Sequence, residues 1–253
     1  MKDVVGLILA AGKGTRMHSE LAKVLHPICD RPMLSYTLAA LRQAGVARII
    51  VVIGHQAERI RDIFAAEEVE WVLQSEQLGT AHAVECALPC LGDFQGTILI
   101  CCGDTPLLTA ETLARFVTAH QQADVDLTVL TTILQQPASY GRVVRDGRGR
   151  IIRIVESKDA GVQERAIREI NSGIYCARAE LLRRLIPKID NNNAQGEYYL
   201  TDMVEKALAE KRQVDGFTVL DSQEILGVNT PEELAAVARL LADRAATVGN
   251  SQG

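Results

Sequence analysis

The N-terminal segment, residues 1–17, constrains the fold most strongly. A continuous apolar run, Val4–Leu9, leads directly into the glycine-rich segment Ala10-Ala11-Gly12-Lys13-Gly14-Thr15-Arg16-Met17. An apolar run of strand length is typical of a strand that is buried on both faces of a sheet. The glycines let the backbone come close to a ligand, and their N–H groups can point at phosphate oxygens. The sequence therefore predicts a buried strand that ends in an anion-binding loop.

Strand-length apolar runs and helical periods then alternate along the chain. Leucines at 34, 38 and 41 recur at helical spacing, Gly45 ends that pattern, and Arg48–Ile53 is a β-branched run. Such alternation predicts an α/β, Rossmann-like, mostly parallel sheet with right-handed crossovers and helices on both faces. Further strands are expected at Glu70–Leu73, Gly96–Cys101, Asp126–Ile133, Ile170–Ala177 and Val214–Val219. Helices are expected at Pro32–Ala44, Ala57–Ala65, Thr80–Ala87, Ala110–Gln121, Leu181–Ile186, Thr201–Glu210 and Pro231–Leu241.

A β-hairpin interrupts this alternation after residue 140. The segments Arg142–Val144 and Ile151–Val155 flank Asp146-Gly147-Arg148-Gly149, which predicts two antiparallel strands joined by a glycine turn. No composition shift marks a linker, so we expect one domain over residues 1–230 with the hairpin as an insertion. A C-terminal helix and a tail that is frayed from Val248 to Gly253 would follow over residues 231–253.

Composition excludes several classes of protein. With 47% hydrophobic and 23% charged residues, the chain has enough apolar material for a core and is unlike a disordered protein. Its net charge of −5 predicts no nucleic-acid-binding surface. We find no signal-peptide pattern and no apolar run of the ~20 residues that a membrane span needs, so we expect no membrane association. Six cysteines without zinc-ligand spacing predict buried, reduced thiols and a cytoplasmic protein.

The glycine loop matches neither of two common nucleotide-binding motifs. A Walker A loop requires Gly-x4-Gly-Lys-Ser/Thr, which the chain lacks. A dinucleotide fingerprint requires a third glycine where Met17 stands, and Ile53-Gly54-His55 offers no acidic residue after the second strand. The cations Arg16 and Lys23 still favour a small anionic ligand, whereas Lys13 could be only a solvated charge.

A second polar loop, Gly103-Asp104-Thr105-Pro106, follows another predicted buried strand. Ligands of open parallel sheets bind outside the carboxyl ends of the strands, so this loop and the glycine loop should share one rim. Together with substrate phosphates, Asp104 could hold Mg²⁺, which typically takes one or two protein oxygens. The alternative is that Asp104 only caps the turn before Pro106.

Eight ordered blocks resemble the sugar-nucleotide pyrophosphorylase family, and within it are similar in order and spacing to the bacterial N-acetylglucosamine-1-phosphate uridyltransferases. The blocks are Leu9–Met17 with Lys23, Gln74–Ala83, Gly103-Asp104, Tyr140–Arg142, Val155–Ala160, Glu169–Gly173, Asn191–Asp202 and Gly227–Asn229. The resemblance implies Mg²⁺-dependent transfer of UMP from UTP to N-acetylglucosamine 1-phosphate, with release of pyrophosphate. In this family a hexapeptide-repeat acetyltransferase domain usually follows, and this sequence has no such repeats.

The resemblance also implies residue roles. Arg16, Lys23 and Asp104 would be the catalytic residues, and Asp104 and Asn229 would hold Mg²⁺. The nucleotide would contact Leu9, Ala10, Ala11, Gly12, Gly14, Thr15, Gln74, Gln77, Gly79, Thr80 and Gly103. The sugar would contact Gly141, Glu156, Asn171, Tyr199 and Thr201. A general base is not required, because the second pKa of a phosphate monoester is near ~6 and the sugar phosphate is already a nucleophile at neutral pH.

Several of these residues have ordinary structural alternatives. They are a polar strand end for Gln74, an ion pair with Lys158 or Arg153 for Glu156, a strand-edge position for Asn171 and a helix cap for Asn229. The chain also departs from the family pattern, with Ala22 in place of a usual proline, Asp30 in place of a glycine and Cys102 in place of an aromatic residue. A nucleotidyltransferase for another sugar phosphate and a catalytically silent nucleotide-sugar-binding protein stay open as functions. The oligomeric state is not indicated.

Overall fold

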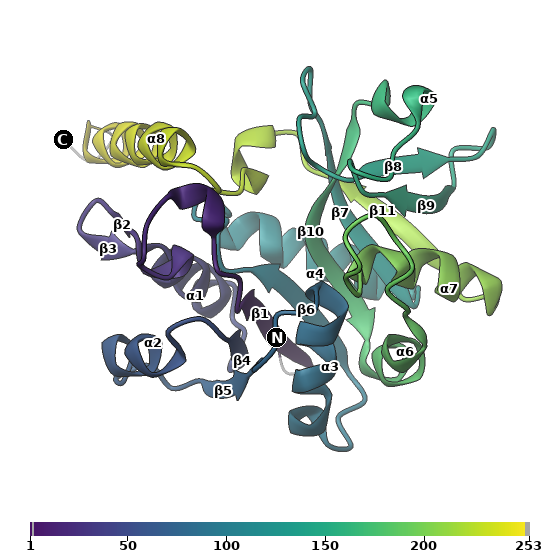
Figure 1. The fold of residues 1–253 in the computed structure, drawn as a ribbon, viewed down its shortest axis with the longest axis horizontal. Coiled ribbons are helices and arrows are strands. Elements are labelled where there is room, and N and C mark those ends of the chain that lie inside the picture. Colours follow the sequence, from purple (N-terminus) through teal and green to yellow (C-terminus); the bar gives the residue numbers. More distant parts are fainter. Residues whose placement is uncertain (2, 251–253) are drawn as a thin grey trace.

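The computed structural model describes residue 1 and residues 3–250, with side chains through residue 244. In the described chain the central sheet follows the strand order β11-β7-β10-β6-β1-β4-β5 (Figure 1). These strands are β1 Val4–Ala10, β4 Arg48–Ile53, β5 Glu70–Leu73, β6 Thr97–Cys102, β7 Leu127–Ile133, β10 Glu169–Arg178 and β11 Val214–Thr218. The expected strands are therefore all present, and no bound is shifted by more than one residue.

The sheet is mostly parallel, and β10 is the reversed strand. β1 pairs in parallel with β4 and β6, β4 with β5, and β11 with β7, whereas β10 is antiparallel to both β6 and β7. Its reversal brings the start of β10 to the edge where the neighbouring strands end, with Asn171 opposite Thr131 and Tyr175 opposite Ile100. Residues after β1, β5 and β6 thus share one rim with the first residues of β10.

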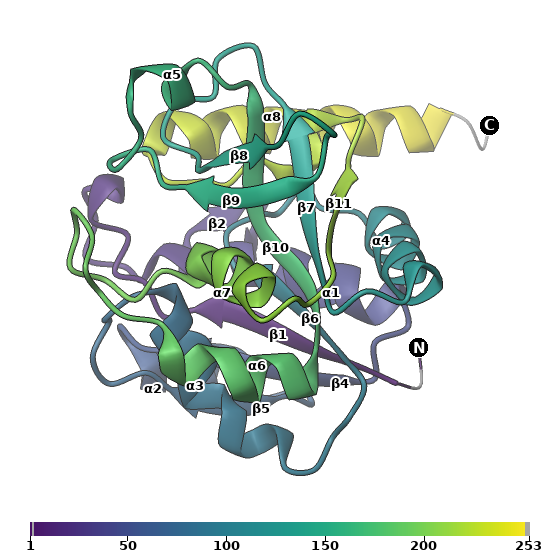
Figure 2. The same cartoon turned by 90° about the vertical axis from the view of Figure 1, so that its right-hand side faces the viewer.

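Alternate residues of the central strands pack under different helices. Val5 and Leu7 of β1 belong to a core with α3 (Thr80–Leu91), α6 (Ala179–Leu185) and α7 (Met203–Ala209). Val4 and Ile8 belong to a second core with α1 (Met33–Gln43), α2 (Ala57–Ile63) and α4 (Ala110–Ala123). Figures 1 and 2 show the two groups of helices on opposite sides of the sheet. The period-2 alternation of strand side chains produces this arrangement, and the predicted fold class is confirmed.

The predicted hairpin is present as β8 (Arg142–Arg145) and β9 (Ile151–Val155). In its turn the Asp146 carboxylate accepts hydrogen bonds from the backbone N–H groups of residues 148 and 150. β8 also pairs with β10 through Arg142 and Ile170, so the hairpin is attached beside the start of β10. The short helix α5 (Val162–Arg165) follows it.

Three local expectations need correction. The C-terminal helix α8 runs over Pro231–Asn250 rather than ending at Leu241, since no glycine or proline interrupts residues 232–248 and Val237 packs against Ile28 and Met33. Val248–Asn250, expected to be frayed, are therefore helical, and the rest of the expected tail lies outside the described residues. A 3-10 turn, Leu200–Asp202, precedes α7 where a continuous helix was predicted. The small hairpin of β2 (Pro27–Ile28) and β3 (Arg31–Pro32) was not predicted.

Burial of the cysteines is also less complete than expected. All six thiols are free, but only Cys101 and Cys176 are buried, while Cys29 is exposed and the others are half-buried.

No helix in the described part of the chain combines the length and the apolar character that crossing a bilayer requires.

Candidate active site

The glycine loop after β1 is held open toward solvent. Gly14 has a φ of 64°, and its carbonyl accepts a hydrogen bond from the N–H of buried Met17 at 2.9 Å. A side chain on Gly14 would meet the Cβ of Lys23 at 2.6 Å, so glycine is required there for both backbone angle and space. Gly12 has nothing within 4 Å of the position of a Cβ. The loop therefore leaves its backbone accessible to a ligand.

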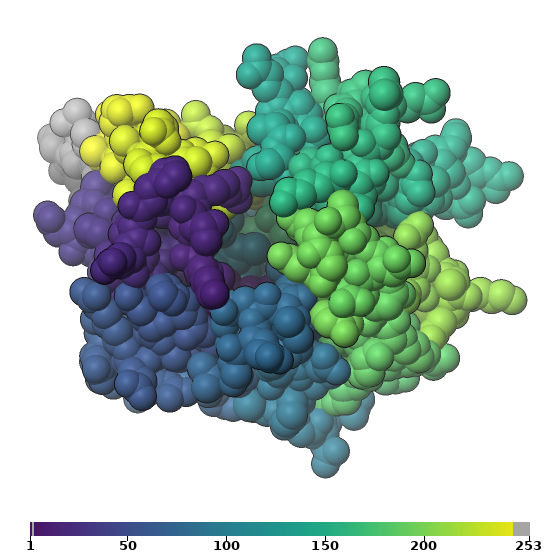
Figure 3. Space-filling model, viewed as in Figure 1, coloured from purple at the N-terminus to yellow at the C-terminus, as the bar shows by residue number. Residues whose placement is uncertain are grey.

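A cavity of about 570 Å³ lies over this loop, within the size range of small-molecule sites. Figure 3 shows a hollow between the purple first loop and the green segment near residue 195. Its lining residues are Leu9, Ala10, Ala11, Gly12, Lys13, Gly14, Thr15, Arg16, Lys23, Val24, Gln74, Gln77, Gly79, Thr80, Ala83, Cys102, Asp104, Glu197 and Asn229. Of the residues expected at the nucleotide and metal, only Gly103 is absent from this lining. Its N–H donates to the Leu9 carbonyl at 2.9 Å, so Gly103 packs the second loop against β1.

A polar cluster in this cavity joins three distant segments of the chain. The Lys23 ammonium donates to Asn229 Oδ1 at 2.8 Å and forms an ion pair with the Asp104 carboxylate. Arg16 Nη2 donates to the same Asn229 oxygen at 2.9 Å. The Val228 N–H donates to the Asp104 carbonyl at 2.9 Å, which fixes the two loops against each other. Two cations and two oxygen-bearing side chains consequently meet at the rim.

The cluster fits a divalent cation that substrate phosphates help to hold. The Asp104 carboxylate and the Asn229 carboxamide oxygen already converge on one positive group, the Lys23 ammonium. Both are hard oxygen donors, which Mg²⁺ prefers. Within the described residues no group of three or more His, Cys, Asp or Glu side chains forms a self-sufficient metal site. The chemistry of the donor set therefore matches a metal with few protein ligands.

The capping alternatives for Asp104 and Asn229 are not what the structure shows. At the start of α8 the Thr230 hydroxyl accepts from the Glu233 N–H at 3.2 Å, while the Glu233 carboxylate accepts from the N–H groups of Asn229 and Thr230. Thr230 is thus the cap, and the Asn229 side chain is left to face the cavity. In the described chain, the Asp104 carboxylate contacts Lys23 and makes no hydrogen bond to the backbone of its own turn.

The other end of the cavity is formed by the loop between β5 and α3. Gln74 is only 2% exposed, and its Nε2 donates to the Gly79 carbonyl at 3.0 Å. Gly79 has a φ of 124°, and a Cβ there would lie 2.5 Å from the Tyr198 carbonyl oxygen. The Leu200 N–H donates to Thr80 Oγ1 at 3.0 Å. These contacts fasten the loop to the segment before α7, and the Gln74 side chain is buried and bonded within the loop.

Three residues expected at the sugar, Gly141, Glu156 and Asn171, lie close to one another. A Cβ built on Gly141 would be 3.5 Å from Glu156 Oε1 and 3.6 Å from Asn171 Cβ. Thr201 donates to Glu156 Oε1 at 3.3 Å, and burial raises the pKa of Glu156. The alternative ion pair with Arg153 is not formed, because Arg153 contacts Glu164 instead. Glu156 is therefore a half-buried acceptor.

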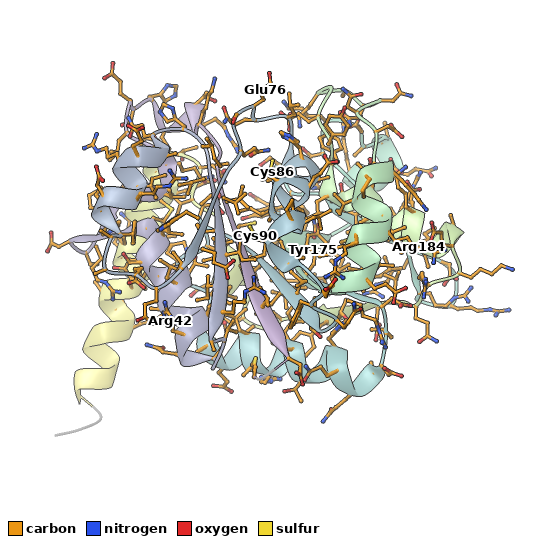
Figure 4. All side chains as sticks on the ribbon, turned by 90° about the horizontal axis from the view of Figure 1, so that it is seen from below. Arg42, Glu76, Cys86, Cys90, Tyr175 and Arg184 are labelled. Carbon is orange, nitrogen blue, oxygen red and sulfur yellow. The ribbon has the colours of Figure 1, made fainter. Side chains whose placement is uncertain are left out.

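Asn171 is buried rather than placed at an open strand edge. It is 7% exposed, donates through Nδ2 to the Tyr175 hydroxyl at 2.8 Å, and accepts from the Gly173 N–H at 3.1 Å. Figure 4 labels Tyr175 in the interior of the molecule. These bonds orient the amide.

A second cavity of about 460 Å³ divides the expected sugar residues. Glu156, Tyr199 and Thr201 line it, whereas Gly141 and Asn171 line neither cavity. Four further carboxylates surround it, from Asp159, Asp190, Asp202 and Glu205. Burial raises the pKa of Asp202 to about 6 and that of Tyr199 to about 12. The structure thus brings three of the residues expected at the sugar into the second cavity and leaves Gly141 and Asn171 outside both cavities.

The sequence reasoning missed some contributors to the site. Glu197 lines the 570 Å³ cavity over the glycine loop, here called the nucleotide-side cavity after the residues expected at the nucleotide, but it was treated only as part of a polar loop. The Tyr140 hydroxyl accepts from the Gly227 N–H at 3.0 Å and so links the hairpin to the segment that carries Asn229. Tyr140 stands beside Gly141 in one of the resemblance blocks, which is the signal that could have identified it.

The three departures from the family pattern have local explanations. The Ala22 N–H donates to Gln56 Oε1 at 3.1 Å, a bond that a proline could not make. Asp30 has a φ of 63°, which explains why a glycine is usual there and which Asp tolerates better than most residues. Cys102 lies against Gly173, and burial raises its pKa to about 12, so the thiol is a neutral packing group.

Comparison with known proteins decides the family. Residues 6–171 match the model of the MobA-like NTP transferase domain. The chain belongs to this family. Its glycine loop, Gln74 loop and Asp104 all fall within the matched residues, while Asn229 lies beyond them.

Curated relatives extend the likeness along nearly the whole chain. A protein named Bifunctional protein GlmU from Pelobacter propionicus is 51% identical over 245 residues, which cover 96% of this chain and 53% of the relative. A protein of the same name from Trichlorobacter lovleyi is 52% identical over 94% of this chain and 52% of its own length. A third protein of this name, from Desulfotalea psychrophila, is 44% identical over 90% of this chain and 68% of its own length. The chain spans about half the length of the first two, and these matches confirm the resemblance that the sequence blocks indicate.

Proposed function

We propose that this chain is a nucleotidyltransferase that moves UMP from UTP to N-acetylglucosamine 1-phosphate and releases pyrophosphate, with Mg²⁺ as the metal. The observation that carries the proposal is the convergence of Arg16, Lys23, Asp104 and Asn229 above an open glycine loop. Positive charge and oriented backbone N–H groups are what a triphosphate requires. The names of the curated relatives and the sequence blocks support the same activity.

The chemistry demands positioning and charge more than proton transfer. The sugar 1-phosphate attacks the α-phosphorus in line, without a general base, because it is already ionised near neutral pH. Arg16 and Lys23 would stabilise the charge on the α-phosphate and on the leaving pyrophosphate. The metal would be held by Asp104 and Asn229 and would supply further positive charge to phosphate oxygens.

Recognition of the two substrates would be divided between the ends of the site. Gln74 and Gly79 would contact the base, and the loop around Gly12 would contact the phosphates. Glu156 and Asn171 would bind the sugar, with Glu156 accepting from hydroxyl groups. Gly141, Tyr199 and Thr201 would complete that subsite.

We place the transferase domain at residues 1–230 and the protein in the cytoplasm. The structure supports this division in one respect, since α8 packs on the outside of the β2–β3 hairpin through Val237 rather than entering the sheet. In Figure 1 α8 lies at the periphery, beyond α1.

A panel of nucleotides and sugar phosphates tests the proposal. Pyrophosphate release would be measured with UTP, CTP, ATP and GTP against N-acetylglucosamine 1-phosphate, glucose 1-phosphate and galactose 1-phosphate in the presence of Mg²⁺. The proposal expects the highest kcat/KM for UTP with the N-acetylated sugar. A higher value for glucose 1-phosphate would assign a different sugar, and no release with any pair would point to a nucleotide-sugar-binding protein without activity.

A further inference from the structure

His82 contacts the buried amide that faces the base end of the nucleotide-side cavity. Gln74 Nε2 lies 3.0 Å from the Gly79 carbonyl oxygen and 3.0 Å from His82 Nδ1. His82 is half-buried in the first turn of α3, and its Nε2 lies 3.7 Å from the sulfur of Cys86, one turn further along. Figure 4 shows Cys86 on α3, nearer than Cys90 to the end where Glu76 lies. Nothing in the family resemblance assigned a role to His82.

The orientation of the Gln74 amide follows from these neighbours. A carbonyl oxygen only accepts hydrogen bonds, so the side-chain atom beside Gly79 must be the NH₂ group. Its second hydrogen can be used only if His82 Nδ1 is an acceptor, which requires the neutral ring with the proton on Nε2. Cys86 suits that tautomer, since burial raises the pKa of its thiol and the neutral sulfur is a weak acceptor for the Nε2–H.

One atom of the amide is left for a ligand. Both Nε2 hydrogens are occupied, while Gln74 Oε1 has no hydrogen-bond partner in the described chain. Gln74 is 2% exposed and lines the nucleotide-side cavity, so this oxygen is the polar atom that the side chain offers there. A base whose N3 lies against this oxygen must donate a hydrogen bond from that atom. The N3 of uracil carries a hydrogen and donates, whereas the N3 of cytosine accepts.

We propose that His82 is a positioning residue for base specificity: its Nδ1 accepts from Gln74, locks Oε1 toward the base, and so favours uracil over cytosine. This inference rests on the proposed nucleotidyl transfer and adds a residue that determines which pyrimidine is used. Without His82 only the bond to the Gly79 carbonyl holds the amide, so a flip that presents NH₂ to the N3 of cytosine breaks one hydrogen bond instead of two. A merely structural histidine would affect both nucleotides equally.

The test compares UTP with CTP in variants of His82. In His82→Leu the ratio of kcat/KM for UTP over CTP should fall about tenfold, the effect of losing one hydrogen bond. His82→Asn keeps an oxygen acceptor close to the former Nδ1 and should hold the ratio within about threefold of the wild-type value. His55→Leu is the matched control, because His55 contacts the Glu20 carbonyl instead of the base-reading amide, and its ratio should not change. An unchanged ratio in His82→Leu, or an equal loss with both nucleotides, would overturn the proposal.

A measurement on the wild-type protein keeps the proposal testable if the variants do not fold. The ¹⁵N chemical shifts of the imidazole nitrogens report the tautomer directly, and the His82 signals are expected to show hydrogen on Nε2 and none on Nδ1 at neutral pH. A hydrogen on Nδ1 would refute the proposed lock. This result does not depend on turnover, so it separates failure of the His82 proposal from failure of the proposed transferase activity, which would appear as wild-type inactivity with every nucleotide.

Discussion

Replacing Lys23 by methionine should have opposite effects on metal binding and on turnover. In the free protein the Lys23 ammonium lies between Asp104 and Asn229, the two residues proposed to hold the metal. The ammonium therefore competes with a metal ion for the oxygens of Asp104 and Asn229. When UTP binds, its phosphates offer the ammonium another partner and release the two oxygens. Lys23→Met removes the competitor and also removes a charge that the transition state needs.

The magnitude follows from the burial of the ion pair. The side chains of Lys23 and Asp104 are 14% and 23% exposed, so the pair is neither fully buried nor fully screened. Two unit charges in near contact attract by about 4 kcal/mol at an effective dielectric constant of 20. Desolvation offsets most of that, leaving about 1–2 kcal/mol. The metal affinity of the free protein should therefore rise about 5- to 30-fold, while kcat should fall at least about 100-fold.

Binding of Mn²⁺, followed by the loss of its free electron paramagnetic resonance signal, measures the first effect in the absence of nucleotide. Lys13→Met is the matched control: it removes the same charge from the lining of the same cavity, and Lys13 forms no ion pair with the side chains described through residue 244. The control should change Mn²⁺ affinity by no more than about threefold. Weaker or unchanged Mn²⁺ binding by a folded Lys23→Met protein would refute the reasoning, whatever its turnover.

Three further predictions concern stability. Gly79→Ala should lower the free energy of unfolding by at least about 2 kcal/mol, because its Cβ would lie 2.5 Å from a backbone oxygen. Gly12→Ala should leave the thermal midpoint of unfolding near the wild-type value, because nothing lies within 4 Å of its Cβ position. Similar thermal midpoints for the two variants would contradict this prediction. Thr230→Ala should lower the free energy of unfolding, measured in urea, by about 1 kcal/mol and leave turnover in place, because Thr230 caps α8. Asn229→Ala should abolish turnover and leave the free energy of unfolding near the wild-type value. A loss of turnover in both variants would contradict the assignment of the cap to Thr230 and of the metal site to Asn229. Buried His120, whose pKa is lowered from 6.5 to about 4 by desolvation, stays neutral in the fold; its stability contribution, about 3 kcal/mol, is complete above pH 6.5 and is lost as pH falls toward 4. His120→Gln should flatten that pH dependence, and an unchanged slope would refute the assignment.

Local sequence patterns determined most of the sheet. The run at Val4–Leu9 and the β-branched run at Arg48–Ile53 are apolar at nearly every position because both faces of the sheet are covered. The reversal of β10 was not predictable, since an apolar strand reads the same in either direction. The pair β2–β3 was missed because each strand has only two residues. The end of α8 was misjudged because a helix can continue without a strong local signal.

For the candidate site, the sequence named residues but not the contacts between them. Sequence blocks named Lys23, Asp104 and Asn229, yet nothing in the sequence indicates that Lys23 bonds to both of the others. Likewise, Asn229 or Thr230 could have been the cap of α8, and only the hydrogen bonds to Glu233 distinguish them. Contacts between residues about 200 positions apart depend on the completed fold, so no local rule supplies them.

The most direct test of the proposed activity is a ³¹P NMR time course with the protein, UTP, N-acetylglucosamine 1-phosphate and Mg²⁺. The transfer mechanism predicts that the sugar monophosphate signal declines as the signals of a sugar diphosphate nucleotide and of pyrophosphate grow in equal amounts. Asp104→Ala should show none of these changes. Growth of UMP and pyrophosphate with the sugar phosphate untouched would mean that water is the acceptor, and a static spectrum would mean that the chain binds without reacting. Either result would contradict the transferase assignment.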